Sequence, residues 1–201
     1  LAQQHQVWAL DIPGFGDSDL PSGAVDADDL VPYVAEALAH TFRGQATDVM
    51  GFSFGGMLAS MIAAEYPQLI KQMILVGVPG LGLFGRKLPM RGMHPDMTAQ
   101  AQRDVHRHNL SVMMLHNAEQ ITEEVVDLQE ANVNRDRLRR RRISNTDIVA
   151  QLQSRWSMPV YGVWGAHDVL YRDTMQDIPK VLTRLDCLAW VPNAGHWVMF
   201  E

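Results

Sequence analysis

The sequence predicts an α/β protein: a mostly parallel sheet with flanking helices and an inserted helical cap. Short apolar runs typical of strands alternate with longer runs whose apolar residues recur every three to four positions. The run at 72–78 is apolar on both faces, as a central parallel strand should be. The segment 98–153 is polar, helical by pattern and without a strand signal. We therefore expect residues 1–83 and 157–201 to form the core and residues 84–156 to form the cap.

The first half of the chain contains the clearest helix signal. Asp26 can cap a helix, and apolar residues then recur at four-residue spacing at Leu30, Val34, Leu38 and Phe42. A glycine-rich turn precedes this helix and an apolar run follows it. We expect a strand at 6–12, a turn at 13–18, a helix at 26–42, a strand at 47–50, a helix at about 56–66 and a strand at 72–78.

The second half returns to strands after the cap. We expect strands at 158–164 and 186–191 with a short helix at 177–182 between them. Cys187 is the only cysteine, which excludes an internal disulfide and a cysteine-rich metal site. We expect this thiol to be buried within the last strand, where it would act as a small hydrophobic group.

The composition limits the function classes. The 201 residues are 47% apolar and 20% charged, which is typical of a folded domain with a real core. The net charge of −6 argues against nucleic acid as a general partner. No apolar run approaches the roughly 20 residues of a membrane helix, and no signal peptide is visible. We expect a cytoplasmic protein that acts on a small molecule, binds no membrane, and has an oligomeric state that the sequence leaves open.

The most specific motif is Gly51-Phe52-Ser53-Phe54-Gly55. It lies between a predicted strand and a predicted helix. In that context Gly-x-Ser-x-Gly is typical of a nucleophile elbow, where a serine lies exposed on a strained turn. Glycines on either side would let neighbouring backbone come close without a Cβ clash. The sequence therefore predicts that Ser53 is a nucleophile.

Two further polar motifs follow predicted strands. Asp168 ends a Gly-Ala-His-Asp segment, and His196 lies in an Asn-Ala-Gly-His-Trp segment. Because the carboxyl ends of parallel strands meet at one edge of a sheet, we expect both side chains near Ser53. A serine hydroxyl needs a base, which a histidine supplies, and an acid orients that histidine. Asp173 is the alternative acid. The predicted triad is Ser53, Asp168 and His196.

These motifs, together with the Asp11–Ser18 turn, resemble the α/β-hydrolases that carry a helical cap. The chain order Ser, Asp, His is that of this family. The resemblance covers nearly the whole chain and implies a serine hydrolase without a metal or cofactor. It also implies that the backbone N–H of Phe54 donates to the oxyanion.

The second oxyanion donor of the family comes from a loop that usually carries His-Gly, and no such segment precedes Ser53. By this resemblance, we expect a fragment that lacks three strands and the helix after the catalytic histidine. The strand at 6–12 would then pair directly with the strand at 47–50 or leave unpaired backbone groups. We expect such a piece to fold poorly and to show little activity alone.

Several other residues have competing interpretations. The Asp11–Ser18 turn is better explained as structural than as catalytic. Six arginines lie between Arg135 and Arg142; a solvated helix face in the cap is the simpler explanation, and recognition of a carboxylate or an acidic carrier is the alternative. We propose three candidate substrate-binding residues, each of which could instead be packing: Phe52, Trp197 and Met113. Met114 is a further candidate for an adaptable acyl pocket.

The leading function is hydrolysis of a small carboxylic ester or related acyl substrate through an acyl-Ser53 intermediate. Trp197 after the histidine is similar to the meta-cleavage-product hydrolases, which cut carbon–carbon bonds. Those enzymes have asparagine where this chain has Phe52, and their cap arginine aligns with Gln129. Perhydrolase activity remains a third option, and dehalogenases and epoxide hydrolases are disfavoured because Ser53 replaces their aspartate. The alternative outside the enzymes is a non-catalytic binding protein of the same fold.

Overall fold

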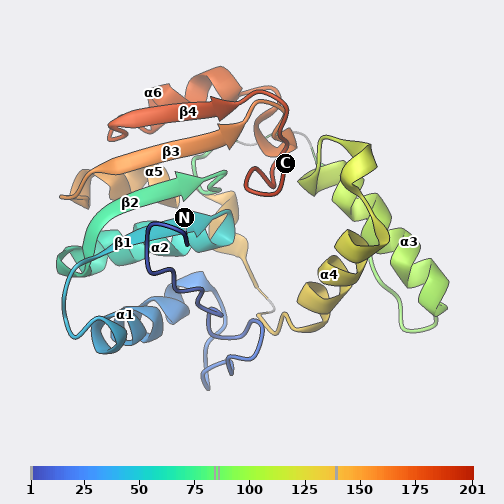
Figure 1. Cartoon of the computed structure of the whole chain (residues 1–201), viewed down its shortest axis with the longest axis horizontal. Helices are drawn as coiled ribbons and strands as arrows, with labels where there is room; N and C mark the ends of the chain where they lie inside the picture. Colours follow the sequence, from blue (N-terminus) through green and yellow to red (C-terminus); the bar gives the residue numbers. More distant parts are fainter. Residues whose placement is uncertain (1, 84, 86, 139) are drawn as a thin grey trace.

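A four-stranded parallel sheet forms the centre of the protein (Figure 1). The computed structural model describes residues 2–83, 85, 87–138 and 140–201. The strands lie in the same order in the sheet as in the chain, so every connection is a crossover. Each strand matches a sequence prediction within a few residues. The strands are β1 (Thr47–Phe52), β2 (Ile70–Val76), β3 (Val160–Gly165) and β4 (Cys187–Val191).

Helix α2 (Phe54–Glu65) is the main packing partner of the sheet. It follows β1 directly, and its residues from Gly56 to Ala64 are all buried. The indole N–H of Trp156 donates to the carbonyl of Ser60 on this helix at 3.0 Å. Helices α1 (Val31–Thr41), which follows a 3₁₀ turn capped by Asp26 as predicted, and α5 (Ile148–Leu152) contact α2. Helix α6 (Ile178–Val181) lies beside β4, at the other end of the sheet (Figure 1).

The segment between β2 and β3 carries two helices that lie apart from the sheet (Figure 1). These are α3 (Ala99–Asn109) and α4 (Glu123–Asn134), with a π-helical turn at Leu110–Met114 after α3. A small core of Leu110, Leu115, Val125 and Val126 joins them. No strand occurs in the described residues of this segment, as predicted.

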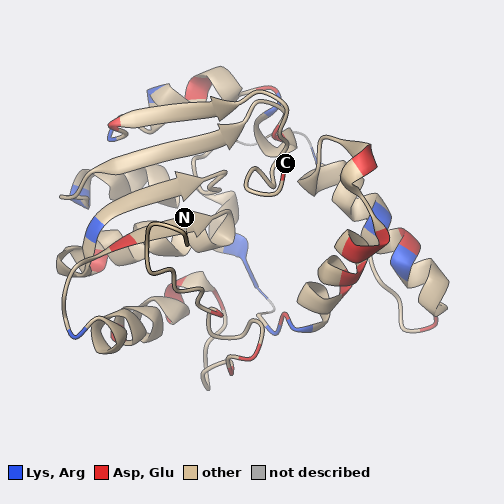
Figure 2. Ribbon diagram, viewed as in Figure 1, with Lys and Arg blue, Asp and Glu red and all other residues tan. Residues whose placement is uncertain are grey.

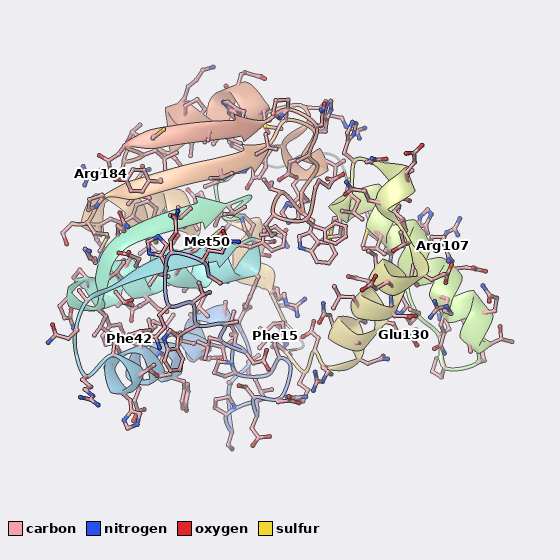
Figure 3. All side chains as sticks on the ribbon, viewed as in Figure 1. Phe15, Phe42, Met50, Arg107, Glu130 and Arg184 are labelled. Carbon is pink, nitrogen blue, oxygen red and sulfur yellow. The ribbon has the colours of Figure 1, made fainter. Side chains whose placement is uncertain are left out.

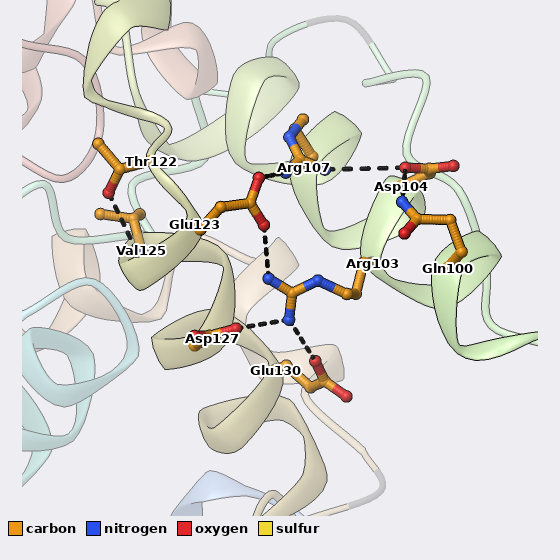
Figure 4. Close-up of polar contacts among 9 residues, drawn as sticks. All are labelled: Gln100, Arg103, Asp104, Arg107, Thr122, Glu123, Val125, Asp127 and Glu130. Carbon is orange, nitrogen blue, oxygen red and sulfur yellow. Dashed lines mark hydrogen bonds and ion pairs between the residues drawn. The ribbon is translucent and has the colours of Figure 1, made fainter.

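Charged groups gather on these two helices, while the strands carry few (Figure 2). The guanidinium of Arg103 on α3 contacts Glu123 at 2.6 Å, Asp127 at 2.5 Å and Glu130 at 3.4 Å on α4 (Figure 4). Hydrogen bonds from Arg103 and Arg107 lower the pKa of the Glu123 carboxyl. The side chains of Glu123 and Asp127 are largely exposed, so these ion pairs contribute little to the free energy of unfolding.

The prediction of a strand at 6–12 is wrong. This segment has no regular structure, and Val7, Trp8 and Leu10 are more than half exposed. A strand needs a neighbour that satisfies its backbone groups, and in the described chain β1 pairs with β2 alone. The outer edge of β1 is therefore open, which was the second of the two arrangements expected. Trp8 packs instead on the ring of Phe42, the residue directly after α1, with 6.1 Å between the ring centroids.

The prediction that Cys187 is buried is also wrong. The residue does lie in the last strand, but its side chain is exposed. The reason is that β4 is an edge strand, paired with β3 alone in the described chain. Each of its residues is partly or fully exposed. None of the helices in the described part of the chain is both long and apolar enough to cross a membrane.

Candidate active site

Ser53 occupies the junction between β1 and α2. Its backbone has φ 49° and ψ −120°, a conformation that residues other than glycine rarely adopt. The Ser53 N–H donates to the carbonyl of Val76 on β2 at 2.8 Å, which ties this strained turn to the centre of the sheet. Strain of this kind persists only where the surrounding structure imposes it, and it is often found at functional sites.

Two glycines make the turn possible, and only one of them, Gly51, was expected. A Cβ on Gly51 would lie 2.5 Å from the Cα of Gly56, and one on Gly56 would lie 2.7 Å from the carbonyl oxygen of Gly51. In contrast, a Cβ on Gly55 would meet only Ile12, at an ordinary 3.7 Å. The interpretation of Gly55 as a close-approach glycine is therefore wrong, because β1 comes closest to α2 at Gly56, one residue after Gly55.

The structure brings His196 and Asp168 to Ser53. The imidazole Nε2 of His196 lies 2.9 Å from Ser53 Oγ, and its Nδ1 lies 2.9 Å from Asp168 Oδ2. His196 is 1% exposed and Asp168 is fully buried. Asp173, the alternative acid, is exposed on the surface. The three side chains form one hydrogen-bonded chain from hydroxyl to carboxylate.

The loops after β3 and β4 hold this pair together. The N–H of His167 donates to the carbonyl of Ala194 at 2.9 Å, and the Asp168 side chain accepts from the N–H of Leu170 at 3.0 Å. Gly77, at the end of β2, has φ 54°, and a Cβ there would lie 3.2 Å from His196 Nδ1. The absence of a side chain at Gly77 thus leaves room for the imidazole–carboxylate contact.

Tyr171 supports the same loop and was not identified from the sequence. Its hydroxyl donates to the carbonyl of Val78 in the connection after β2, and the residue is 3% exposed. Burial, with a smaller contribution from the charge of Asp168, raises the pKa of this hydroxyl, which keeps it protonated as a donor. A tyrosine three residues after an aspartate carries no recognisable pattern, so only the fold shows this contact.

The first turn of α2 offers backbone donors next to Ser53. Phe54 and Gly55 are its first two residues, and the N–H groups at the start of a helix have no intrahelical acceptor. The Phe54 ring packs on Phe15 at 5.5 Å between centroids, and the guanidinium of Arg141 lies 5.4 Å from the Phe54 ring and 5.1 Å from the Phe15 ring. Arg141 is thus close to the turn that carries Ser53.

The three candidate substrate-binding residues lie in different surroundings. The ring of Phe52 lies 5.0 Å from the imidazole of His196. Trp197 stacks on Phe200 and packs against the small core of the α3–α4 segment. Met113 lines an open pocket of about 530 Å³ that also has walls from the loops after β3 and β4. Phe52 therefore contacts the site itself, whereas Trp197 and Met113 lie where these loops meet the helical segment.

The Asp11–Ser18 turn is held by its own hydrogen bonds. The Asp11 carboxylate accepts from the N–H of Asp17 at 3.0 Å, and the Ser18 hydroxyl donates to the carbonyl of Asp11 at 2.7 Å. The Arg137 guanidinium donates to the carbonyls of Gly16 and Ser18, at 3.0 and 2.5 Å. This network closes a tight turn, which supports a structural role for these residues.

The described arginines of the run are mostly exposed, as predicted, but they do not lie on a helix, so that part of the interpretation is wrong. Helix α4 ends at Asn134, and the described part of the run up to Arg141 is irregular; Arg139 lies outside the described residues. Arg135 pairs with Asp17, and Arg137 and Arg141 make the contacts given above. Arg137 thus binds the Asp11–Ser18 turn and Arg141 the rings of Phe15 and Phe54, although most of the described arginines are exposed to solvent. Among the described residues, no group of three or more His, Cys, Asp or Glu side chains is placed to hold a metal ion.

Comparison with known proteins gives a family and a range of relatives. The family model of the alpha/beta hydrolase fold matches residues 1–201. A pimeloyl-[acyl-carrier protein] methyl ester esterase of Aeromonas hydrophila is 36% identical over 76 residues, which are 38% of this chain and 28% of that protein. A 2-hydroxymuconate semialdehyde hydrolase of a Pseudomonas species is 31% identical over 81 residues, 40% of this chain and 29% of that protein. The matched part thus spans less than a third of either curated relative.

Solved structures share the fold over most of the chain. A meta-cleavage product hydrolase from Pseudomonas fluorescens superposes with a TM-score of 0.71 at 18% identity, covering 94% of this chain and 71% of that one. A putative aryl esterase from Burkholderia cenocepacia gives a TM-score of 0.71 at 20% identity with the same coverage. At these identities the likeness establishes the architecture and leaves the chemistry to the residues of the site.

Proposed function

The chain belongs to the α/β-hydrolase fold family, and from that premise we propose that it cleaves a small carboxylic ester or related acyl substrate. The observation that carries the proposal is the continuous hydrogen-bonded chain from Ser53 through His196 to Asp168, with 2.9 Å at both steps. The strained φ of 49° at Ser53 adds support, because a strained backbone that presents a hydroxyl is typical of a nucleophile elbow.

The reaction begins with attack of Ser53 Oγ on the substrate carbonyl carbon. His196 Nε2 takes the hydroxyl proton as the new bond forms, and Asp168 holds the Nδ1–H and stabilises the imidazolium. The tetrahedral intermediate collapses when His196 returns that proton to the leaving alkoxide, which departs as an alcohol. Water then attacks the acyl-serine with the same base, releasing the acid and restoring Ser53.

The developing oxyanion needs positioned donors, and the N–H of Phe54 at the start of α2 is our candidate. Removing one such donor from an oxyanion hole costs about 3–4 kcal/mol of transition-state stabilisation. The partial positive charge at the N-terminus of α2 acts in the same direction. The proposal requires no metal and no cofactor. It includes a small-molecule substrate, no nucleic-acid or membrane partner, and a cytoplasmic location.

The second candidate is hydrolysis of a carbon–carbon bond in a dienoate ketone. It draws support from the partial match to a semialdehyde hydrolase and from Trp197 directly after His196. Phe52 disfavours it, because its ring packs on the imidazole where those enzymes place an asparagine. A non-catalytic binding protein is the third candidate, and the close contact between Ser53 and His196 argues against it.

Covalent labelling with a fluorophosphonate tests the enzyme proposal directly. The probe should label the chain at Ser53, and Ser53→Ala should abolish labelling. Ser154→Ala, at an exposed serine in the 3₁₀ turn before β3, is the matched control and should label normally. Absence of Ser53-dependent labelling in the full-length protein would refute the hydrolase proposal. Turnover of p-nitrophenyl esters compared with a dienoate ketone then decides between the two bond types, and faster dienoate cleavage by orders of magnitude would overturn the ester preference.

A further inference from the structure

The loop that carries His196 is bound directly to the connection between α3 and α4. We define residues 193–201 as the histidine loop and residues 110–117 as the π turn with the three residues after it, here the cap turn. The N–H of Trp197 donates to the carbonyl of Met114 at 2.8 Å. A Cβ on Gly195 would lie 2.8 Å from the backbone nitrogen of His116, so the two segments touch at their main chains.

Glu201 makes this contact polar and specific. Its carboxylate accepts from the N–H of Asn117 at 2.7 Å and from the N–H of His116 at 2.9 and 3.1 Å. The same carboxylate accepts from the N–H of Gly195 at 2.5 Å. Three backbone donors from two segments that are about 80 positions apart in sequence thus converge on one side chain. Hydrogen bonds to a charged acceptor are shorter and about twice as strong as neutral ones.

We propose that Glu201 is a positioning residue that fixes the placement of His196 against Ser53 and makes it depend on the cap turn. Gly195 is the neighbour of His196, so the bond from its N–H to Glu201 sets where the imidazole can lie relative to Ser53 Oγ. Misplacing a catalytic group by about 1 Å lowers a rate by about 100-fold. This inference rests on the proposed function, because it assigns a role within the same site.

A second contact carries the coupling to the other side of the pair. The imidazole of His116 in the cap turn stacks on that of His167 at 3.7 Å between centroids and 5° between planes. His167 directly precedes Asp168 in the loop after β3. The cap turn therefore contacts the loop of the base through Glu201 and Trp197, and the loop of the acid through the histidine stack. A shift of the cap turn would move both loops that hold the His196–Asp168 contact.

A purely structural role for Glu201 is the competing explanation, and the experiment separates the two. The resonance of the Nδ1 proton that His196 shares with Asp168 reports the geometry of the pair by NMR, without any turnover. We propose to record it in the full chain for Glu201→Ala and for Glu201→Gln, which keeps one acceptor oxygen. Glu124→Gln is the matched control, because Glu124 lies exposed on α4. Ester kinetics and thermal unfolding would be measured on the same samples.

The expected results are as follows. Glu201→Ala broadens or shifts the Nδ1 proton resonance well below the unfolding temperature and lowers kcat about 100-fold with KM changed less than three-fold. Glu201→Gln lowers kcat about 10-fold, and Glu124→Gln changes neither. An unchanged resonance and kcat in both Glu201 variants, with or without a lower unfolding temperature, would overturn the proposal. If the parent chain turns over no ester, the proposed function fails, and the resonance alone still decides the role of Glu201.

Discussion

A Cβ atom on Gly51 would lie 2.5 Å from the Cα atom of Gly56, closer than any real Cβ contact. The last residues of β1 and the first turn of α2 therefore cross with their main chains touching. This contact turns the chain back sharply enough to give Ser53 its φ of 49°. Neither glycine has freedom to gain a side chain, because the atoms in the way belong to backbone that the sheet and the helix fix.

We therefore expect Gly51→Ala to lower the free energy of unfolding by about 1–3 kcal/mol, the usual cost of overpacking. It should also reduce fluorophosphonate labelling of Ser53, because the turn must open to admit the methyl group. Gly55→Ala is the matched control. A methyl group there meets only Ile12 at 3.7 Å, and alanine is favoured over glycine in a helix by up to about 1 kcal/mol.

Urea unfolding of the two variants measures this difference. The expected order is Gly55→Ala at or above the parent chain and Gly51→Ala clearly below it. Equal destabilisation by both changes would show that the motif acts as a symmetric pair and that the contact with Gly56 is not the determining one.

Tyr171→Phe should lower the free energy of unfolding by about 1–3 kcal/mol, because it leaves the buried carbonyl of Val78 without its donor. The hydroxyl also predicts a pH dependence. Its pKa is raised in the folded protein from an ordinary value of 10.0, so above about pH 10 the unfolded chain loses this proton while the folded chain keeps it. The contribution of the Tyr171 hydroxyl to the free energy of unfolding is therefore fully present below about pH 10 and falls as the pH rises further.

Thermal unfolding of the parent chain and of Tyr171→Phe between pH 8 and 11 tests this sign. The gap between the two stabilities should narrow as the pH passes 10. A gap that stays constant or widens would exclude Tyr171 as the source. Tyr33→Phe, at a tyrosine that is 45% exposed on α1, is the control for removal of a phenol hydroxyl and should cost less stability at pH 8 than Tyr171→Phe.

Most of the candidate site could be predicted from the sequence because its parts are local. Ser53, Asp168 and His196 each follow an apolar strand, and a parallel sheet brings such positions to one edge. Glu201 and Tyr171 could not be predicted in this way, because their partners are backbone groups that only the folded loops bring near. The prediction of a strand at 6–12 failed for a related reason: the segment is rich in apolar residues, but a strand needs a pairing neighbour that the local pattern does not reveal.

The arginine run illustrates the same limit at the level of charge. Six arginines in eight positions are compatible with a solvated helix, and nothing in the local pattern indicates aromatic partners far along the chain. Arg141 nevertheless lies over the rings of Phe15 and Phe54, and Arg137 bonds the carbonyls of the Asp11–Ser18 turn. Contacts with a sequence separation above 80 residues are decided by topology, so the local pattern predicted the exposure of most of these arginines but not their distant partners.

Arg141→Ala should lower the free energy of unfolding by about 1 kcal/mol, because the guanidinium packs near two aromatic rings and its side chain is 39% exposed. It should also lower the labelling rate at Ser53, since the Phe54 ring that it covers belongs to the residue directly after Ser53. Arg140→Ala, at an exposed neighbour in the same run, is the control and should change the free energy by less than about 0.5 kcal/mol. A loss of equal size in both variants would assign the effect to net charge instead of to the aromatic contact.

The open edge of β1 predicts self-association. Met50 on this strand is 47% exposed (Figure 3), and Trp8 in the irregular N-terminal segment is 61% exposed. An unpaired strand edge flanked by apolar side chains is a template for pairing with another chain.

We expect the 201-residue chain to associate at micromolar concentrations, and Met50→Lys to reduce the associated fraction several-fold by placing a charge on that edge. Sedimentation velocity over a concentration series measures this, with Met90→Lys as the control at an exposed methionine outside the sheet. Association that persists unchanged in Met50→Lys, or that Met90→Lys reduces as much, would place the contact elsewhere on the molecule.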